Sequence, residues 1–485
     1  MSWAIEPPRR RRRGRGILSV LLALLAVAGL AVGGYYLPAQ SATFVATAIP
    51  TVGRTSTVCT AAAAERGSQA SVGAVVTRRA PGRTGTLTVA PLGQPRPTLK
   101  LTDQGIGRLL PATAPVVLRA DGVMARASSG GVFGIGTSGA QRGLMAAACG
   151  LAGTEHWFVG VGAASTARSD LILTNPDDSL AEVDLTFFGA KGEVVVPGSP
   201  GVVVPAQGSR NLSLESLSSI AGPLSVSVTA TTGRVAAVTR DLRSAALTPA
   251  GADWHRSAVA PSTSVVIPGV PAGEGPRQLL VVNPGTGRAR VQVQALALTG
   301  PFAPAGATTL DVAPRSTAVV DLAPGLLGQA AGVALRSSSP ITGSVLSTST
   351  RPGAAADFAV QPATGPLEST GVVALATMAG VDSELVLSNG TGRATLASLE
   401  VVGYNGVSLH TDEVLLGPHS TSTRRINQVS PAYLEVTVPD GSAVRGSVVF
   451  DQPEGGVAGL STVELTSPDV AQRAQSASPD PSVGR

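Results

Sequence analysis

Apolar and polar residues alternate along several short stretches of the chain, a pattern typical of β-strands. Residues 224–228 read LSVSV, residues 434–438 read LEVTV and residues 291–294 read VQVQ. Successive side chains of a strand point to opposite faces of its sheet. The alternation therefore predicts strands with one buried face and one solvent-facing side.

Three similar segments recur at a nearly constant interval and indicate an internal repeat. Each ends an apolar strand in an asparagine turn: SDLILTNPDD at Asn175, RQLLVVNPGT at Asn283 and SELVLSNGTG at Asn389. The asparagines are separated by 108 and 106 residues. A set of features that recurs at a nearly fixed interval indicates an internal repeat.

A second shared feature follows each asparagine turn after about thirty residues. The segments read VVVPAQGS around Pro205, DVAPRST around Pro314 and LLGPHST around Pro418. Each places proline at the second position of a predicted tight turn, after an apolar strand. A fourth, degenerate copy is predicted to precede these three.

Strand count within one repeat predicts the fold class. The first clear repeat contains seven strand candidates, at 156–163, 169–175, 181–188, 193–204, 209–214, 222–230 and 234–242. Seven short strands in about 100 residues are typical of an immunoglobulin-like β-sandwich. The alternative is a β-propeller in which each repeat supplies two four-stranded blades. We therefore expect an all-β fold of tandem sandwich repeats, with the propeller as the alternative.

One long apolar segment near the start predicts a membrane anchor. Residues 17–37 read ILSVLLALLAVAGLAVGGYYL, with no charge between Arg15 and Arg54. As a helix this segment would be about 31 Å long, enough to cross the hydrocarbon core. The arginine block 9–13 precedes it, which favours a cytoplasmic N-terminus and an extracytoplasmic body.

The alternative is a cleaved signal peptide and a secreted body. Residues 39–41, Ala-Gln-Ser, resemble a cleavage site before Ala42. The apolar run is longer than an ordinary signal-peptide core, so the anchor is preferred. The expected organisation is an arginine-rich cytoplasmic segment, the anchor, a degenerate β unit, three sandwich repeats and a disordered tail, at 1–16, 17–37, 43–150, 151–250, 262–350, 370–465 and 466–485.

Composition and charge exclude one class of partner. Six of the basic residues lie in the first sixteen positions, so the body carries 30 basic and 30 acidic residues. A nucleic-acid-binding protein needs a basic surface to neutralise phosphates, and a neutral body does not supply one. Aromatic residues make up only 3% of the chain.

Two cysteines, Cys59 and Cys149, both fall in the predicted extracytoplasmic part. An oxidising compartment permits a disulfide, and two is the smallest number that can form one. We therefore expect a bridge between them. A metal site would need more ligands, and no histidine cluster accompanies the cysteines.

Two small clusters at the entrances of repeats are weak binding candidates. They contain His156 and Trp157 in one and Asp253 and Trp254 in the other. An acid, a histidine and an aromatic ring could form a polar binding spot, but neighbours along a strand point to opposite faces. Ala356-Asp357-Phe358 repeats the pattern at the next junction, which favours a structural role.

The sequence contains no recognisable catalytic, cofactor or metal motif. Gly-rich residues 128–139 lack the strand–loop–helix context and the Gly-Lys-Ser/Thr of a phosphate loop. No Gly-x-Ser-x-Gly nucleophile elbow is present. We therefore expect no enzyme activity and no cofactor.

The order of features resembles an uncharacterised actinobacterial, membrane-anchored envelope family, domain of unknown function 5719. The resemblance rests on the arginine-rich start with its anchor, RGLMAAACGLAGTEHWFVG across Cys149 and Trp157, the LTNPDD turn and the GADW segment. It implies a shared topology and carries no activity. The third repeat departs from the pattern, because glycine replaces proline after Asn389.

Taken together, the sequence predicts a non-enzymatic scaffold or protein-interaction protein of the bacterial cell envelope, held in the membrane by one helix. The expected partner is another envelope protein or a cell-wall glycan. The alternative function is a glycan-binding module. Sugars stack on exposed aromatic rings, for which Trp157, Trp254, Tyr404 and Tyr433 are the candidates.

Overall fold

The computed structural model describes residues 53–60, 68–78 and 84–468, apart from residues 219, 247, 377, 455, 457 and 458. These residues belong to one compact unit, Pro50–Arg485. The chain is all-β, with 62% strand and 3% helix, as predicted. The predicted anchor 17–37 and most of the predicted tail lie outside the described residues. Within the described part, no helix is long and apolar enough to span a bilayer.

The strands form sheets that the chain builds two at a time, alternating between two facing sheets. The first pair of sheets has the strand orders β4-β3-β6-β1-β9 and β5-β2-β7-β8. Its elements are β1 (Arg54–Cys59), β2 (Ser68–Val76), β3 (Gly85–Pro91), β4 (Leu99–Leu101), β5 (Ile106–Pro111), β6 (Val116–Gly122), the 3₁₀ turn η1 (Val123–Arg126), β7 (Ser128–Gly136), β8 (Gly143–Ala148) and β9 (Gly150–Leu151).

The second pair has the orders β10-β17-β13-β14, with β15 also on β13, and β11-β12-β18-β19, with β16 also on β12. Its elements are β10 (Glu155–Val161), β11 (Ala163–Ala164), β12 (Ala167–Asn175), β13 (Ala181–Gly189), β14 (Gly192–Val194), β15 (Val202–Val204), β16 (Gly208–Ser213), α2 (Leu214–Leu217), β17 (Leu224–Thr232), β18 (Ala236–Ala245) and β19 (Thr248–Arg256).

The third pair is joined by one 19-residue strand, β26. The first half of β26 pairs with β20 and β22, and its second half pairs with β21 and β27. The elements are β20 (Ser262–Val270), β21 (Arg277–Asn283), β22 (Ala289–Ala297), β23 (Gly300–Phe302), β24 (Thr309–Val312), β25 (Ser316–Asp321), α3 (Ala323–Leu326), β26 (Ala331–Ser349) and β27 (Asp357–Pro362).

The fourth pair has the orders β28-β33-β30-β31 and β32-β29-β34-β35. Its elements are β28 (Thr370–Leu375), β29 (Asp382–Asn389), β30 (Thr395–Gly403), β31 (Ser408–Leu416), β32 (Thr421–Ile426), β33 (Ala432–Thr437), β34 (Val444–Asp451) and β35 (Leu460–Glu464).

The strand order of the second pair differs from the predicted immunoglobulin-like order. All seven predicted strands are present, although 193–204 is divided into β14 and β15. Immunoglobulin domains place the first, second, fourth and fifth strands in one sheet. Here the first strand, β10, pairs with β17, and β12 instead joins β16 and β18. An eighth strand, β19, extends the second sheet.

Both faces of several strands are buried, which corrects the predicted solvent-facing side. Ser225 and Ser227 are 0% and 5% exposed, and Glu435 is 1% exposed. The reason is that neighbouring pairs of sheets pack on these polar faces. The Thr317 hydroxyl, for example, donates a hydrogen bond to the Ser225 oxygen at 2.8 Å, from the third pair to the second. On β22 the alternation holds, because Gln292 is exposed.

The asparagine turns and proline turns of the repeat contact each other in the same way three times. In each copy the asparagine Nδ2 donates to the carbonyl four residues later and to one near the proline turn. Its Oδ1 accepts the amide two residues later, as in an Asx turn. After each proline a left-handed residue donates its backbone N–H to the asparagine turn: Gln207, Arg315 and His419.

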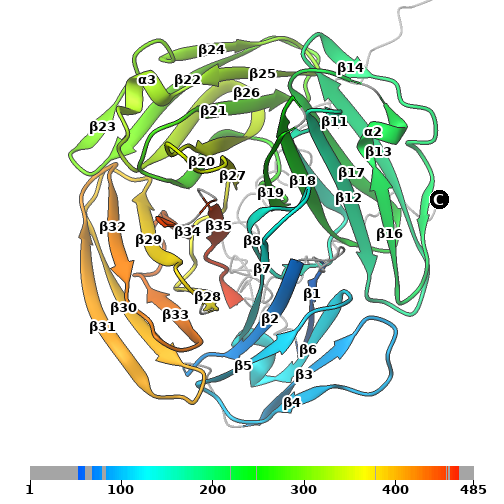
Figure 1. Cartoon of the computed structure of the whole chain (residues 1–485), viewed down its shortest axis with the longest axis vertical. Coiled ribbons are helices and arrows are strands. Elements are labelled where there is room, and N and C mark those ends of the chain that lie inside the picture. Colours follow the sequence, from blue (N-terminus) through cyan, green and yellow to red (C-terminus); the bar gives the residue numbers. More distant parts are fainter. Residues whose placement is uncertain are drawn as a thin grey trace, which may run out of the picture. The chain divides into compact units, whose positions relative to one another are not determined.

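The four pairs contact one another in a closed cycle. The first pair touches the second through β8 and β19, and the second touches the third through β10 and β26. The third touches the fourth through β20 and β34, and the fourth returns to the first through β35 and β8. Figure 1 shows the pairs following one another around four innermost strands, β8, β19, β27 and β35. We call these four the inner strands.

The predicted disulfide is present. Cys59 at the end of β1 is bonded to Cys149, directly after β8, with Cα atoms 4.4 Å apart. The two residues are 90 positions apart in the chain. The bridge therefore links the two sheets of the first pair beside the inner strands.

We predict that Cys59→Ser lowers the free energy of unfolding by roughly 4 kcal/mol under oxidising conditions, since the bridge restricts a long loop of the unfolded chain. Urea unfolding with and without reductant measures the effect. The reduced wild type and the reduced variant should unfold together. Equal stability of the oxidised wild type and the variant would contradict a stabilising bridge.

Candidate functional site

The inner strands run in the same direction and therefore present their ends together. Asp357, the first residue of β27, contacts Leu460, the first residue of β35, and Leu144, the second residue of β8. At the opposite ends, Cys149, Arg256, Ala363 and Glu464 line one pocket. The amino ends thus meet at a buried carboxyl group, and the carboxyl ends meet at a cavity.

Asp357 connects three of the four inner strands through backbone hydrogen bonds. Its Oδ2 accepts the amides of Leu144 on β8, at 2.9 Å, and Leu460 on β35, at 3.0 Å. Its Oδ1 accepts the amide of Phe358 at 3.0 Å. The side chain is fully buried, so these N–H groups replace the water that a carboxyl group normally binds.

Two glycines make room for this carboxyl group. A Cβ atom added to Gly143 would lie 2.5 Å from Asp357 Oδ1, and one added to Gly251 would lie 2.3 Å from it. Both glycines also have positive φ angles, of 142° and 116°, which side chains rarely adopt. The close approach of β8 and β19 to Asp357 therefore requires glycine at both positions.

Asp253 makes a second set of contacts with the inner strands, slightly nearer to their carboxyl ends than those of Asp357. Its Oδ1 accepts the Ser461 hydroxyl of β35 at 2.8 Å and the amide of Trp254 at 2.9 Å. Longer contacts of 3.4 Å reach the amides of Ala146 on β8 and Val360 on β27. Together, the two aspartates contact all four inner strands.

Burial raises the pKa of both carboxyl groups well above the usual range. For Asp253 the removal of water is the largest cause, and the negative charge of Asp357 acts in the same direction. For Asp357 desolvation also dominates, although the backbone hydrogen bonds oppose it. The protonated forms are therefore favoured in the folded protein.

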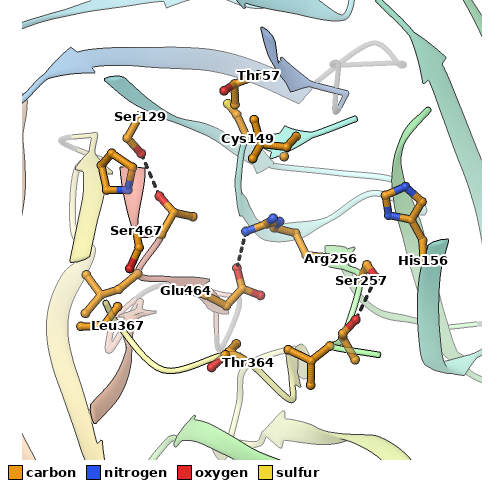
Figure 2. Close-up of a pocket in the computed structure, with 18 of the residues that line it drawn as sticks. Thr57, Ser129, Cys149, His156, Arg256, Ser257, Thr364, Leu367, Glu464 and Ser467 are labelled. Atoms are coloured by element: carbon orange, nitrogen blue, oxygen red, sulfur yellow. Dashed lines mark hydrogen bonds and ion pairs between the residues drawn. The ribbon is translucent and has the colours of Figure 1, made fainter. Parts of the chain in front are cut away.

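The pocket at the carboxyl ends of the inner strands has a volume of about 400 Å³. Its walls come from three of the four pairs and from the segments that follow the inner strands. Figure 2 shows Arg256 extending into the pocket, with Glu464 beside it and His156 on the opposite wall. The remaining lining is apolar or carries hydroxyl groups, including Leu151 and Leu367.

Arg256 and Glu464 form a loose ion pair in this pocket. Arg256 Nη1 lies 3.7 Å from Glu464 Oε2, beyond hydrogen-bond length, and the side chains are 25% and 9% exposed. Glu464 Oε2 is buried and has no hydrogen-bond partner in the described part of the chain. The Arg256 guanidinium has no hydrogen bond to another described residue either. Both groups therefore keep free hydrogen-bonding capacity.

The other polar groups of the pocket are largely engaged. His156 Nε2 lies 2.8 Å from the Val235 carbonyl, and burial lowers the pKa of this imidazole. The Ser257 hydroxyl accepts the Trp157 amide at 2.9 Å and donates to the Ala258 carbonyl. These contacts leave the ion pair as the charged feature of the lining.

The four candidates from the sequence separate into different surroundings. His156 lines the pocket, whereas Trp157 lies behind it, 7% exposed, with Nε1 donating to Glu155 Oε1 at 2.6 Å. Asp253 lies among the inner strands. Trp254 is 2% exposed in the apolar core of the first pair, so its ring offers no exposed face.

The sequence reasoning missed Arg256 and Glu464. They are the last residues of β19 and β35, and they lie 208 positions apart. Arg256 follows the GADWH segment by one residue, but nothing local indicates its ionic partner. Only the parallel arrangement of the inner strands brings the two together.

A buried histidine–aspartate pair lies outside the pocket. His255 Nδ1 is 3.4 Å from Asp241 Oδ2, and both side chains are 0% exposed. The imidazole packs edge-on against Phe158, with ring centroids 5.8 Å apart. Because neither residue reaches the surface, this pair contacts no solute. Among the described residues, no three histidine, cysteine, aspartate or glutamate side chains are grouped as a metal site would require.

The chain matches a known protein family over most of its length. A family model described as "Family of unknown function (DUF5719)" matches residues 111–427. The chain belongs to this family. The DUF5719 match includes Asp253, Arg256 and Asp357 and ends before Glu464. No curated protein matches the chain.

The raised pKa values predict how stability changes with pH. The pKa of Asp357 is higher in the folded protein than in the unfolded chain. The carboxyl group therefore contributes its full share to the free energy of unfolding below about pH 4, and this contribution is lost as the pH rises through the folded pKa. The stability of the wild type should therefore fall with pH relative to Asp357→Asn, which cannot titrate. Urea unfolding of both proteins at a series of pH values from about 4 upward measures the difference between their free energies of unfolding.

Asp103→Asn is the matched control, because Asp103 is exposed and its replacement should leave the pH dependence of stability as it is in the wild type. A wild type and an Asp357→Asn variant with parallel pH profiles would contradict a protonated carboxyl at the centre.

Proposed function

We propose that this chain is a membrane-anchored, extracytoplasmic interaction protein of the cell envelope. We further propose that it is not an enzyme and that it binds its partner at the pocket formed by the carboxyl ends of the inner strands. The observation that carries the proposal is this pocket, in which four separate segments of the chain converge on one loose ion pair.

The topology rests on two independent observations. The apolar segment 17–37 follows an arginine block, the arrangement that retains the N-terminus in the cytoplasm. The bonded pair Cys59–Cys149 supports an oxidising compartment for the body, since structural disulfides are rare in the cytoplasm. Both support an extracytoplasmic location for the pocket.

The fold is best described as propeller-like. The four pairs of sheets, of which the third is joined through β26, follow one another around the inner strands, as blades do around a propeller axis. Within each repeat the chain still alternates between two sheets, as in a sandwich. This arrangement supports a rigid binding platform, because no pair of sheets is separate from its neighbours.

The chemistry of the pocket supports binding rather than catalysis. Glycoside hydrolysis ordinarily requires two carboxyl groups across the scissile bond, and nucleophilic catalysis requires a base beside the nucleophile. Among the described lining residues, Glu464 is the only carboxylate, and the His156 Nε2 is engaged with a backbone carbonyl.

The glycan-binding alternative has weaker support. The four aromatic rings that could stack on sugars are all buried, with exposures of 8% or less: Trp157, Trp254, Tyr404 and Tyr433. Tyr404 instead packs against Gly73 and Gly107 of the first pair. None of these four rings therefore offers a face on which a sugar could stack.

We predict that alkaline phosphatase fused after Arg485 is active in cells, whereas green fluorescent protein fused there is dark after export. Removal of residues 1–41 should reverse both results, because the export signal is lost. Fluorescence of the full-length fusion in the cytoplasm would contradict the topology.

A photo-crosslinking amino acid at Leu151, which lines the pocket and is 43% exposed, should capture an envelope component in cells. The same amino acid at Val429, which is 96% exposed and lies away from the pocket, is the control. Identical crosslinks from both positions would argue against the pocket as the binding site.

A further inference from the structure

The geometry points to a ligand class for the pocket: we propose that it binds a zwitterionic α-amino-acid head group attached to an apolar body. This inference rests on the proposed function, because it names the ligand of the same pocket. The ligand carboxylate would bind Arg256, and its ammonium would bind Glu464.

The unfilled hydrogen-bonding capacity of the ion pair is the first argument. At 3.7 Å, Arg256 Nη1 and Glu464 Oε2 are too far apart to satisfy each other by a hydrogen bond. A buried carboxylate oxygen without a donor is costly, and such atoms in native structures commonly face a water or a ligand. The missing group must donate to Glu464 and accept from Arg256.

Charge balance selects among ligands that can do both. Arg256 and Glu464 together are neutral, so an added anion would face the Glu464 carboxylate and an added cation would face the Arg256 guanidinium. A zwitterion avoids both penalties, because its charges can lie antiparallel to those of the pair. Charge-assisted hydrogen bonds of this kind are about twice as strong as neutral ones.

The rest of the pocket fits the body of such a ligand. Apolar side chains surround the ion pair, including Leu151, Val259, Leu367 and Leu465. The volume of about 400 Å³ is within the usual range for small-molecule sites. An aliphatic side chain would therefore be buried beside the charged head group. A free amino acid and a cell-wall peptide with a free amino-carboxylate end share this chemistry.

Calorimetric titration of the full-length, detergent-solubilised chain tests the inference with L-leucine, N-acetyl-L-leucine and L-leucinamide. We expect leucine to bind, and each derivative to bind roughly tenfold or more weakly, because each leaves one buried charge without its partner. A muropeptide that ends in free diaminopimelate serves as the peptide arm. Tighter binding of this peptide than of leucine would identify the cell wall as the source.

Variants separate the two charges. Glu464→Gln should weaken leucine binding roughly tenfold and bring N-acetyl-leucine within about threefold of leucine, because the anion that demanded an ammonium is gone. Arg256→Gln should likewise weaken leucine binding roughly tenfold and bring leucinamide within about threefold of leucine, because the cation that required a carboxylate is gone. Arg424→Gln, which removes an exposed ion pair with Asp412, is the matched control and should leave all affinities unchanged. Thermal unfolding of each variant verifies that it is folded.

Three results would overturn the inference. The first is equal affinity for leucine and N-acetyl-leucine, and the second is equal affinity for leucine and leucinamide. The third is that neither leucine nor the muropeptide binds at millimolar concentration. Each can occur while the Leu151 crosslink still captures an envelope partner. Failure of the ligand class is therefore distinguishable from failure of the proposed function.

Discussion

Two carboxyl groups without a cationic partner in the described chain lie at the centre of this protein, and the arrangement of its sheets depends on them. A carboxyl group removed from water must have its oxygens satisfied by donors. Asp253 and Asp357 obtain those donors from strands of the other repeats. The repeats therefore cannot separate without breaking these buried hydrogen bonds and exchanging them for hydrogen bonds to water. The glycines at 143 and 251 belong to the same constraint, because they allow the strands to approach.

The pocket follows from this constraint. The aspartates fix the lateral positions of the inner strands near their amino ends, and the strands then run together to the same opposite end. Arg256 of the second repeat and Glu464 of the fourth meet there because their strands end there. The disulfide supports the same wall, since Cys149 directly follows β8 and lines the pocket. The binding chemistry is thus a consequence of how the ends of the repeats are held.

Local features of the fold could be predicted from the sequence. The asparagine and proline turns were visible because turn chemistry depends on residues close in the chain. The strands of the second pair and the Cys59–Cys149 bridge were also predicted. The sheet order was not, since strand spacing does not reveal which strands pair. The burial of Ser225 and Glu435 was missed for the same reason: alternation reports two faces, but not whether another sheet covers the polar one.

The candidate site was less accessible to sequence reasoning than the fold. Of the four residues singled out, His156 lines the pocket, whereas Trp254 fills a core that its neighbours in sequence do not reveal. The repeated Ala-Asp-aromatic pattern relates Asp253 to Asp357 and favours a structural role for both. Their common position, however, depends on contacts between residues more than 100 positions apart, such as Asp253 with Ser461.

Hydrogen exchange of individual backbone amides tests the central claim most directly. The amides of Leu144 and Leu460 donate to the Asp357 carboxyl group rather than to a strand partner. If Asp357 holds the inner strands together, these amides open only when the whole unit unfolds, and their exchange free energy equals the free energy of global unfolding. Exchange of these two amides through low-energy local opening, while the strands around them stay protected, would contradict the account.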